Sequence, residues 1–80
     1  MKVKLKLAQV GMNMETATIV EWLKQPDEAF KKGEPLYEIE TEKVTQEIEA
    51  PGDGRLLEIL VAEDEDADVG QEVCLVDLEL

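Results

Sequence analysis

Lys43 is the residue whose type and setting best fit covalent chemistry. It lies in Glu40-Thr41-Glu42-Lys43-Val44-Thr45, between two segments with the alternating pattern of strands. The flanking pattern makes Glu42 and Lys43 the central pair of a four-residue turn from Thr41 to Val44, which puts the amine at an exposed tip. An exposed lysine is ordinarily only solubilising, so its chemistry depends on the residues around it.

The other side chains offer little for nucleophilic catalysis. The chain has no histidine and no serine, and Cys74 is its single cysteine, which excludes a Ser/His pair, a Cys/His pair and an internal disulfide. We therefore expect a protein that is not an enzyme and has no catalytic residues of its own. Cys74 falls on the strand phase assigned to the interior, which favours a buried, inert thiol.

The charge balance excludes several classes of partner. Twenty acidic and eight basic residues give a net charge of −12, which repels nucleic-acid phosphates and anionic lipid headgroups. No apolar run approaches the roughly 20 residues that span a bilayer, and Met1–Leu7 alternates unlike a signal-peptide core. We expect one soluble, monomeric domain over residues 1–80, with no nucleic-acid or membrane partner and with partners that are locally basic.

Short alternating runs predict an all-β fold, because a period of two residues is that of a strand with one buried face. A helix over Ala17–Lys24 is disfavoured by its β-branched residues. The predicted strands are separated by turns rich in Gly, Pro and Asp. They are Val3–Leu7, Thr18–Leu23, Tyr37–Glu40, Val44–Ile48, Leu56–Val61 and Val73–Leu78.

An internal repeat predicts how these strands are arranged. Shifting the sequence by 37 positions lays Thr16–Glu40 over Asp53–Asp77, with apolar positions facing apolar positions. We expect a flattened β-sandwich of two small antiparallel sheets related by a quasi-two-fold axis, with the Lys43 turn and the paired termini at equivalent places on opposite sheets. The identities are Glu21/Glu58, Leu23/Leu60, Asp27/Asp64, Glu28/Glu65 and Gly33/Gly70.

The same residues, taken in order, resemble a known family across essentially the whole chain. They are similar to the lipoyl domain, of the biotinyl/lipoyl attachment family, in the dihydrolipoamide acyltransferase component of 2-oxoacid dehydrogenase complexes. Its modified lysine sits in a Glu-Thr-Asp-Lys-Ala/Val hairpin. The matching segments here are Val10–Glu15, Thr18–Leu23, Lys32–Leu36, Glu38–Val44 and Glu49–Pro51 with Gly54.

The resemblance implies a barrel-sandwich hybrid fold and an amide between the Lys43 amine and lipoic acid. The attachment site is flanked by Glu40, Thr41, Glu42 and Val44. The lipoyl group then acts as a swinging arm that carries acyl groups and reducing equivalents, while the protein supplies position and recognition. The free amine must attack an activated lipoyl group, and nearby carboxylates favour its charged form, so activation must come from the attaching enzyme.

The resemblance also implies partners. They are a lipoate ligase or lipoyl transferase, a thiamin-dependent 2-oxoacid decarboxylase, an acyltransferase core and the flavoprotein dihydrolipoyl dehydrogenase. The loop after the first strand is the segment implied in partner recognition, and it consists of Gly11, Met12, Asn13, Met14 and Glu15. Met12 and Met14 fit partner contacts and packing beneath the loop equally well.

Two other functions remain alternatives. Biotinyl domains share the fold and carry biotin for carboxyl transfer, but their lysine is usually flanked by methionines, so Glu42 and Val44 favour lipoate. The second alternative is an unmodified, lipoyl-like structural adaptor, and the lysine at the centre of the hairpin argues against it. The expected location is bacterial or archaeal cytoplasm, or alternatively the mitochondrial matrix. Both a free-standing domain and a piece of a longer acyltransferase agree with the sequence.

The chain departs from the family at two kinds of position. Asp27-Glu28 and Asp64-Glu65 stand where the family often has glycine before an aspartate. Aspartate tolerates a positive φ better than most residues, so we expect both turns to form at some loss of stability. Glu42 replaces the usual aspartate beside the lysine, which keeps the charge and lengthens the side chain.

Two further features have structural explanations. Asp64-x-Asp66-x-Asp68 has the alternating acids of an EF-hand loop, but Val69 occupies the glycine position and Leu75 the position of the bidentate glutamate. We expect a solvated acidic loop and no metal site. Trp22 lies on an apolar strand and is expected in the core, where its indole N–H needs an acceptor.

Overall fold

The computed structural model describes residues 1–9, 14–42 and 44–79 of the protein. The secondary structure of these residues consists of strands. They form two four-stranded antiparallel sheets, of order β1-β8-β6-β3 and β5-β4-β2-β7. We call them the terminal sheet and the hairpin sheet. In chain order the strands are β1 (Lys2–Lys6), β2 (Thr16–Trp22), β3 (Ala29–Phe30), β4 (Pro35–Glu40), β5 (Thr45–Glu49), β6 (Gly54–Ile59), β7 (Asp66–Asp68) and β8 (Glu72–Leu78).

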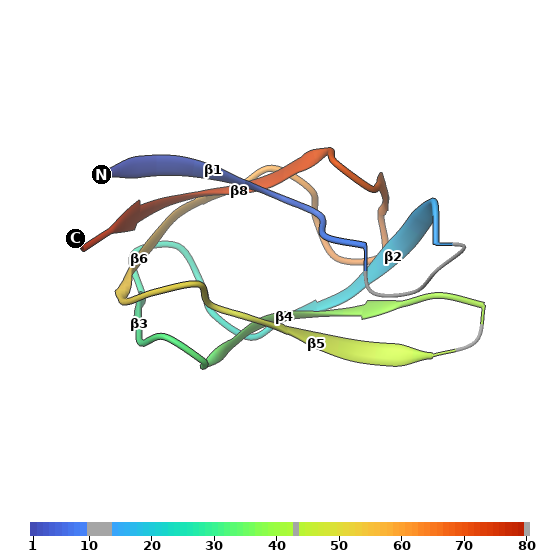
Figure 1. Cartoon of the computed structure of the whole chain (residues 1–80), viewed down its shortest axis with the longest axis horizontal. Coiled ribbons are helices and arrows are strands. Elements are labelled where there is room, and N and C mark those ends of the chain that lie inside the picture. Colours follow the sequence, from blue (N-terminus) through green and yellow to red (C-terminus); the bar gives the residue numbers. More distant parts are fainter. Residues whose placement is uncertain (10–13, 43, 80) are drawn as a thin grey trace.

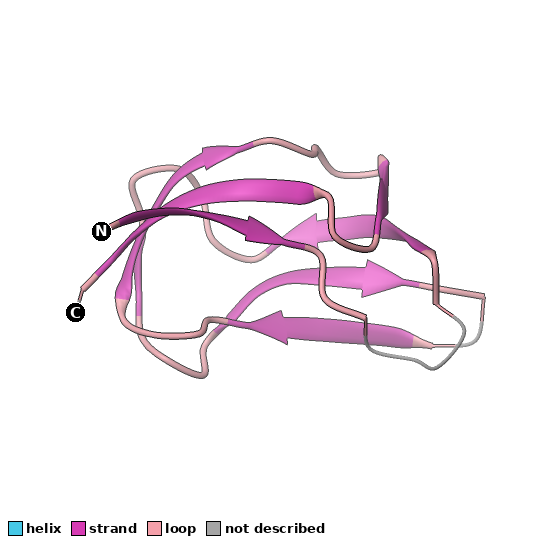
Figure 2. Cartoon of the chain, turned by 45° about the horizontal axis from the view of Figure 1, so that its top comes forward, coloured by secondary structure: helices cyan, strands magenta, loops and turns pink. Residues whose placement is uncertain are grey.

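The two sheets lie face to face, and both chain ends are at the same end of the sandwich (Figure 1). Figure 2 shows strands and loops, with no helix in the described part of the chain. The predicted all-β sandwich is therefore confirmed. The described residues include no helix with the length and apolar character needed to cross a bilayer.

The 37-residue repeat relates one sheet to the other. The shift takes β2 onto β6, β3 onto β7 and β4 onto β8, and the two sheet orders then correspond, with β5 in the place of β1. Hydrogen bonds between backbones repeat with the same spacing. Asp27 N–H donates to the Leu56 carbonyl at 2.7 Å, and Asp64 N–H donates to the Ile19 carbonyl at 2.7 Å. The predicted quasi-two-fold arrangement is thus confirmed.

The two aspartate turns form as expected. Asp27 and Asp64 have φ values of 73° and 69°, in the left-handed region where glycine is usual and aspartate is tolerated. The next residue closes each turn, because the Glu28 carboxylate accepts the Gln25 N–H at 2.8 Å and the Glu65 carboxylate accepts the Ala62 N–H at 2.9 Å. The loss of stability at these turns stays a prediction.

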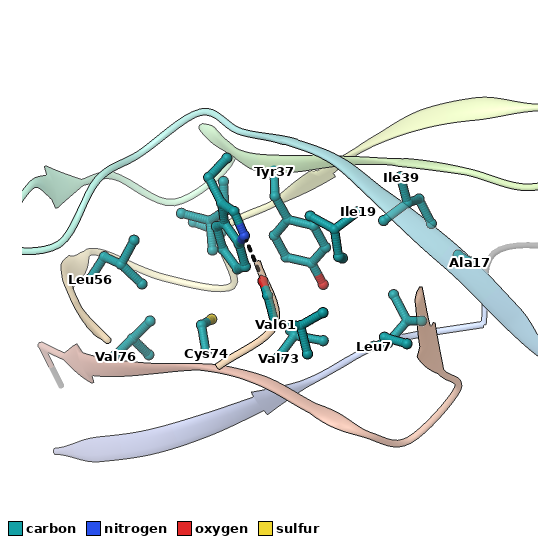
Figure 3. Close-up of a cluster of buried hydrophobic side chains, with 14 of the residues drawn as sticks. Leu7, Ala17, Ile19, Tyr37, Ile39, Leu56, Val61, Val73, Cys74 and Val76 are labelled. Carbon is teal, nitrogen blue, oxygen red and sulfur yellow. Dashed lines mark hydrogen bonds between the residues drawn. The ribbon is translucent and has the colours of Figure 1, made fainter. Parts of the chain in front are cut away.

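The core fills the space between the sheets (Figure 3). Trp22 and Tyr37 pack with ring centroids 4.7 Å apart, and the Trp22 indole N–H donates to the Val61 carbonyl at 2.9 Å. The core position and the acceptor predicted for Trp22 are confirmed. The buried side chains are Leu7, Ala17, Ile19, Trp22, Phe30, Leu36, Tyr37, Ile39, Ala50, Leu56, Val61, Ala67, Val73, Cys74 and Val76.

Tyr37 and Cys74 occupy equivalent positions in the repeat, and both are buried. Burial raises the pKa of the Cys74 thiol from an ordinary value of 9.0 to about 12. Burial, and next the charge of Cys74, raises the pKa of Tyr37 as well. The thiol therefore stays protonated at neutral pH, which agrees with the inert cysteine predicted from the sequence.

The sequence pattern did not predict two short strands, β3 and β7. Elements of two or three residues are too short to show an alternation, and they form because β6 and β2 offer edges for pairing. The prediction of an acidic loop through Asp68 is wrong at its end, since Asp66–Asp68 forms β7 and Ala67 enters the core. Within the described residues, no group of three or more His, Cys, Asp or Glu side chains is arranged to hold a metal ion.

Candidate functional site

The β4–β5 hairpin is the element that the sequence singled out. The strand ladder ends at the pair Glu40 and Thr45, and the backbone N–H of Thr41 then donates to the Val44 carbonyl at 2.8 Å. Thr41 and Val44 therefore face each other as the outer residues of the turn, as predicted. Lys43 itself lies outside the described residues.

The residues on either side of that position are open to solvent. Glu40 and Glu42 are exposed, and Val44 is 50% exposed although its side chain is apolar. Thr41 is half-buried. Figure 1 shows this end of β4 and β5 at the end of the sandwich away from the N and C labels. The adjoining ends of β4 and β5 therefore lie at the opposite end of the sandwich from the N and C labels.

The sheet that carries the hairpin is acidic. Its four strands contain Glu21, Glu38, Glu40, Glu47, Glu49, Asp66 and Asp68 and no basic residue. The basic residues of the described chain lie elsewhere, on β1, on β6 and in the segments that flank β3. A partner surface that approaches this sheet is favoured when it is basic.

The predicted recognition loop is described only at its end, since Gly11, Met12 and Asn13 lie outside the described residues. Met14 is half-buried and packs against the core cluster. Glu15 is exposed, and its carbonyl accepts the Val69 N–H at 2.9 Å. The described end of the loop is therefore attached to the body of the domain through packing and backbone hydrogen bonding.

The side chain of Thr41 is a feature that sequence reasoning missed. Its Oγ1 accepts the Val44 N–H at 3.2 Å and donates to the Val44 carbonyl at 3.3 Å. The signal available was a threonine directly before the turn, because Ser and Thr hydroxyls readily bond to nearby backbone groups. Threonine is also common within strands, so the residue type alone does not separate the two roles.

Comparison with known protein families identifies the family of this chain. A family model for biotin and lipoyl attachment, described as that of a biotin-requiring enzyme, matches residues 3–76. The chain belongs to the biotin/lipoyl attachment family. The family resemblance inferred from the sequence motifs is confirmed, and the chain is an attachment domain of this family.

Curated relatives of the attachment domain are acyltransferase components. The chain is 36% identical over 95% of its length to the dihydrolipoyllysine-residue acetyltransferase component of the acetoin cleaving system of Bacillus subtilis. It is 40% identical over 91% of its length to the dihydrolipoyllysine-residue succinyltransferase component of the 2-oxoglutarate dehydrogenase complex of Rickettsia bellii. It spans 19% and 18% of the lengths of these relatives.

Solved structures agree with the family. The lipoyl domain of the 2-oxoglutarate dehydrogenase complex from Azotobacter vinelandii matches with a TM-score of 0.75 and 30% identity, over 91% of this chain and 92% of that one. A single-chain, multi-domain long-chain acyl-CoA carboxylase matches with a TM-score of 0.81 over 99% of this chain and 7% of that one. At 18% identity, the second match shows a shared fold.

Proposed function

We propose that this domain carries lipoic acid as an amide on Lys43 and presents it as a swinging arm within a 2-oxoacid dehydrogenase complex. The observation that carries the proposal is the β4–β5 turn, in which the N–H of Thr41 meets the carbonyl of Val44 at 2.8 Å. Glu42 and Val44 are exposed there, beside the position of the lysine. A covalent arm needs such an accessible tip and no enclosing pocket.

Attachment forms one bond and breaks one. The Lys43 amine attacks the carboxyl carbon of an activated lipoyl group, the leaving group departs with its electron pair, and the nitrogen gives up a proton. A lipoate ligase or lipoyl transferase supplies the activated group. The chain contributes the position of the amine, because a misplacement of about 1 Å is enough to lower such a rate by about 100-fold.

The attached group supplies dithiolane chemistry for acyl and electron transfer when bound, and the chain supplies display and recognition. The proposed partners are a thiamin-dependent decarboxylase, an acyltransferase core and dihydrolipoyl dehydrogenase. Tethering the arm to a stable domain replaces diffusion by a high effective concentration at each active site. The acidic hairpin sheet supports docking to basic surfaces around those sites.

Lipoate is favoured over biotin by the residues beside the lysine. The acidic Glu42 and the branched, half-exposed Val44 stand where biotinyl domains usually have methionines. The match to a lipoyl domain of similar length, at 30% identity, also supports lipoate.

Intact mass measurement after co-expression with a lipoate ligase and a biotin ligase tests the proposal. We expect the mass increment of one lipoyl amide on the wild-type chain and none on Lys43→Ala. Lys6→Ala is the matched control, because Lys6 has the equivalent offset in the 37-residue repeat, and it should keep the increment. A biotinyl increment, no increment, or an adduct that persists on Lys43→Ala would overturn the proposal.

The position of the lysine within the turn gives a second test. Exchanging residues 42 and 43 through Glu42→Lys with Lys43→Glu keeps composition and charge and moves the amine by one residue. We expect modification to be largely abolished while the far-ultraviolet circular dichroism spectrum is unchanged. Efficient lipoylation of the exchanged variant by the same ligase would show that the turn does not set the position.

A further inference from the structure

Among the described residues, the hydrogen bonds that close the β4–β5 turn beyond the strand ladder all involve Thr41. Thr41 Oγ1 accepts the Val44 N–H at 3.2 Å and donates to the Val44 carbonyl at 3.3 Å, while the Thr41 N–H also donates to that carbonyl at 2.8 Å. Both backbone polar groups of Val44 are thus bound by Thr41. We call these three hydrogen bonds the Thr41 clamp.

The clamp lies beyond the end of the hydrogen-bonded ladder between β4 and β5. The last paired residues of β4 and β5 are Glu40 and Thr45. Beyond them, each hydrogen bond between the described residues of the two arms involves Thr41. The turn signal itself is weak here, since Glu42 and Lys43 are not the Asn-Gly or Asp-Gly pair that closes a tight hairpin by its own backbone preference. The clamp therefore stabilises the turn, a role that the turn residues themselves have in other hairpins.

We propose that Thr41 is a positioning residue for lysine modification, and that its hydroxyl fixes the geometry in which an attaching enzyme captures the hairpin. The inference rests on the proposed function and goes beyond it by assigning this step to one side chain. Thr41 is assigned no contact with the activated lipoyl group. It acts through Val44, by fixing the two residues that bracket positions 42 and 43.

The expected consequence appears in binding to the ligase. When the hydroxyl is lost, the native turn becomes one conformation among several, and the ligase must select it from that mixture. An apparent affinity falls in proportion to the population that is competent to bind. Two lost side-chain hydrogen bonds of ordinary strength lower the equilibrium constant for the native turn about tenfold, which lowers its population by up to about tenfold. We therefore expect KM to rise about tenfold while kcat is nearly unchanged.

Steady-state lipoylation of the full chain by a lipoate ligase, with ATP and lipoic acid, tests the inference. Thr41→Val removes the hydroxyl and keeps the branched shape, and it should show the tenfold rise in KM. Thr41→Ser restores a hydroxyl and should return KM to within about threefold of the wild type. Thr45→Val is the matched control, because the Thr45 hydroxyl makes no hydrogen bond to a described residue, and it should leave KM unchanged.

Hydrogen exchange gives an independent readout on the unmodified chain. The Val44 amide should exchange about tenfold faster in Thr41→Val than in the wild type, while amides of the terminal sheet keep their wild-type rates. Thr41→Ala serves as the second variant without a hydroxyl should Thr41→Val fail to fold. A wild-type KM in both hydroxyl-free variants, an equal rise in Thr45→Val, or no rescue by Thr41→Ser would overturn the inference.

Failure of the proposed function is distinguishable from failure of the clamp. A wild-type chain that gains no lipoyl group contradicts the function before any variant is compared, and the inference falls with it. A wild-type chain that is modified with the same KM as Thr41→Val contradicts the clamp and leaves the function standing.

Discussion

The terminal sheet and the hairpin sheet share a strand order and a 37-residue relation, yet their ends are closed in different ways. At the terminal end, the Met1 ammonium donates to the Asp77 carboxylate at 2.8 Å and to the Leu78 carbonyl at 2.7 Å. At the hairpin end, the closing contacts come from Thr41 and Val44. The terminal end is closed by an ion pair between residues that are far apart in the sequence. The hairpin end is closed by hydrogen bonds between residues that are close in the sequence.

Packing follows the same division. Gly54 lies on β6, and a Cβ atom added there would clash with the Asp77 carbonyl oxygen of β8. Its equivalent in the hairpin sheet is Ala17, which has a Cβ and is buried. The backbone of β8 therefore leaves no room for a side chain at position 54, whereas position 17 holds a methyl group. Equivalent positions of the two sheets therefore differ in the side chain that their surroundings admit.

Charge separates the two sheets as well. Glu38 on β4 pairs in register with Glu47 on one side and Glu21 on the other. The equivalent residue of the terminal sheet, Leu75, has Lys4 and Glu58 as its neighbours. Like charges directly opposite one another destabilise a sheet. The hairpin sheet thus has like charges opposite one another at a position where the terminal sheet has an apolar residue.

The largest expected effect is that of Gly54→Ala, which tests the close approach of β6 and β8. The added methyl meets backbone, which cannot rotate away, so we expect a loss of about 3 kcal/mol in the free energy of unfolding. Urea denaturation measures it. Gly52→Ala is the control, since nothing lies within 4 Å of its added Cβ, and it should be neutral within about 0.5 kcal/mol. Equal effects of both substitutions would contradict the close approach.

Alkaline pH should weaken the domain through the equivalent pair Tyr37 and Cys74. Because burial raises the pKa of Cys74 to about 12, the unfolded thiol ionises at lower pH than the folded one. The contribution of the protonated thiol to the free energy of unfolding is complete below pH 9.0. It is lost as pH rises toward about 12, at up to about 1.4 kcal/mol per pH unit.

Thermal or urea unfolding from pH 8 to 10 measures this loss. Cys74→Ala lowers the baseline stability through the cavity it leaves, and it should flatten the decline between pH 9 and 10. Tyr37 titrates at higher pH and remains in that variant. An unchanged slope in Cys74→Ala would show that the buried thiol is not the linked group.

Trp22 donates a side-chain hydrogen bond that its equivalent in the repeat, Ile59, cannot make. Trp22→Phe tests how much that hydrogen bond contributes to stability. The substitution keeps an aromatic ring beside Tyr37 and leaves the Val61 carbonyl without its donor, so we expect a loss of about 1.5 kcal/mol. Ile59→Val is the matched change in the other sheet and should cost about 0.5 kcal/mol, since Ile59 is only half-buried. Chemical denaturation with fluorescence from Tyr37, or circular dichroism, gives both values.

The smallest effect concerns the charge contrast. Glu38→Lys replaces two repulsive cross-strand neighbours with two attractive ones, and we expect a gain of about 0.5 kcal/mol in low salt. Glu58→Lys, at the position equivalent to Glu21, should bring no gain because it faces Leu75. The gain should shrink in 1 M salt, where charges are screened beyond about 3 Å. A gain that is independent of salt would point to packing.

Much of the fold follows from the sequence, because each long strand carries its own alternation and the repeat relates the two halves. The aspartate turns at Asp27 and Asp64 were also predictable, since their positions repeat and aspartate tolerates positive φ. Strands β3 and β7 were not, because their pairing depends on edges that other segments provide. The family and the hairpin turn were read from local motifs, and the modification of Lys43 remains a prediction.

The sequence alone predicts an all-β domain with two related halves and one lysine between two strands. The contacts that hold the two halves together depend on segments that meet only in the folded chain. Gly54 must be glycine because the Asp77 backbone, 23 positions away along the chain, lies against it. The alternation of apolar and polar residues can be seen along each strand, because burial alternates from one residue to the next, whereas the Gly54 contact exists only after β6 and β8 have paired.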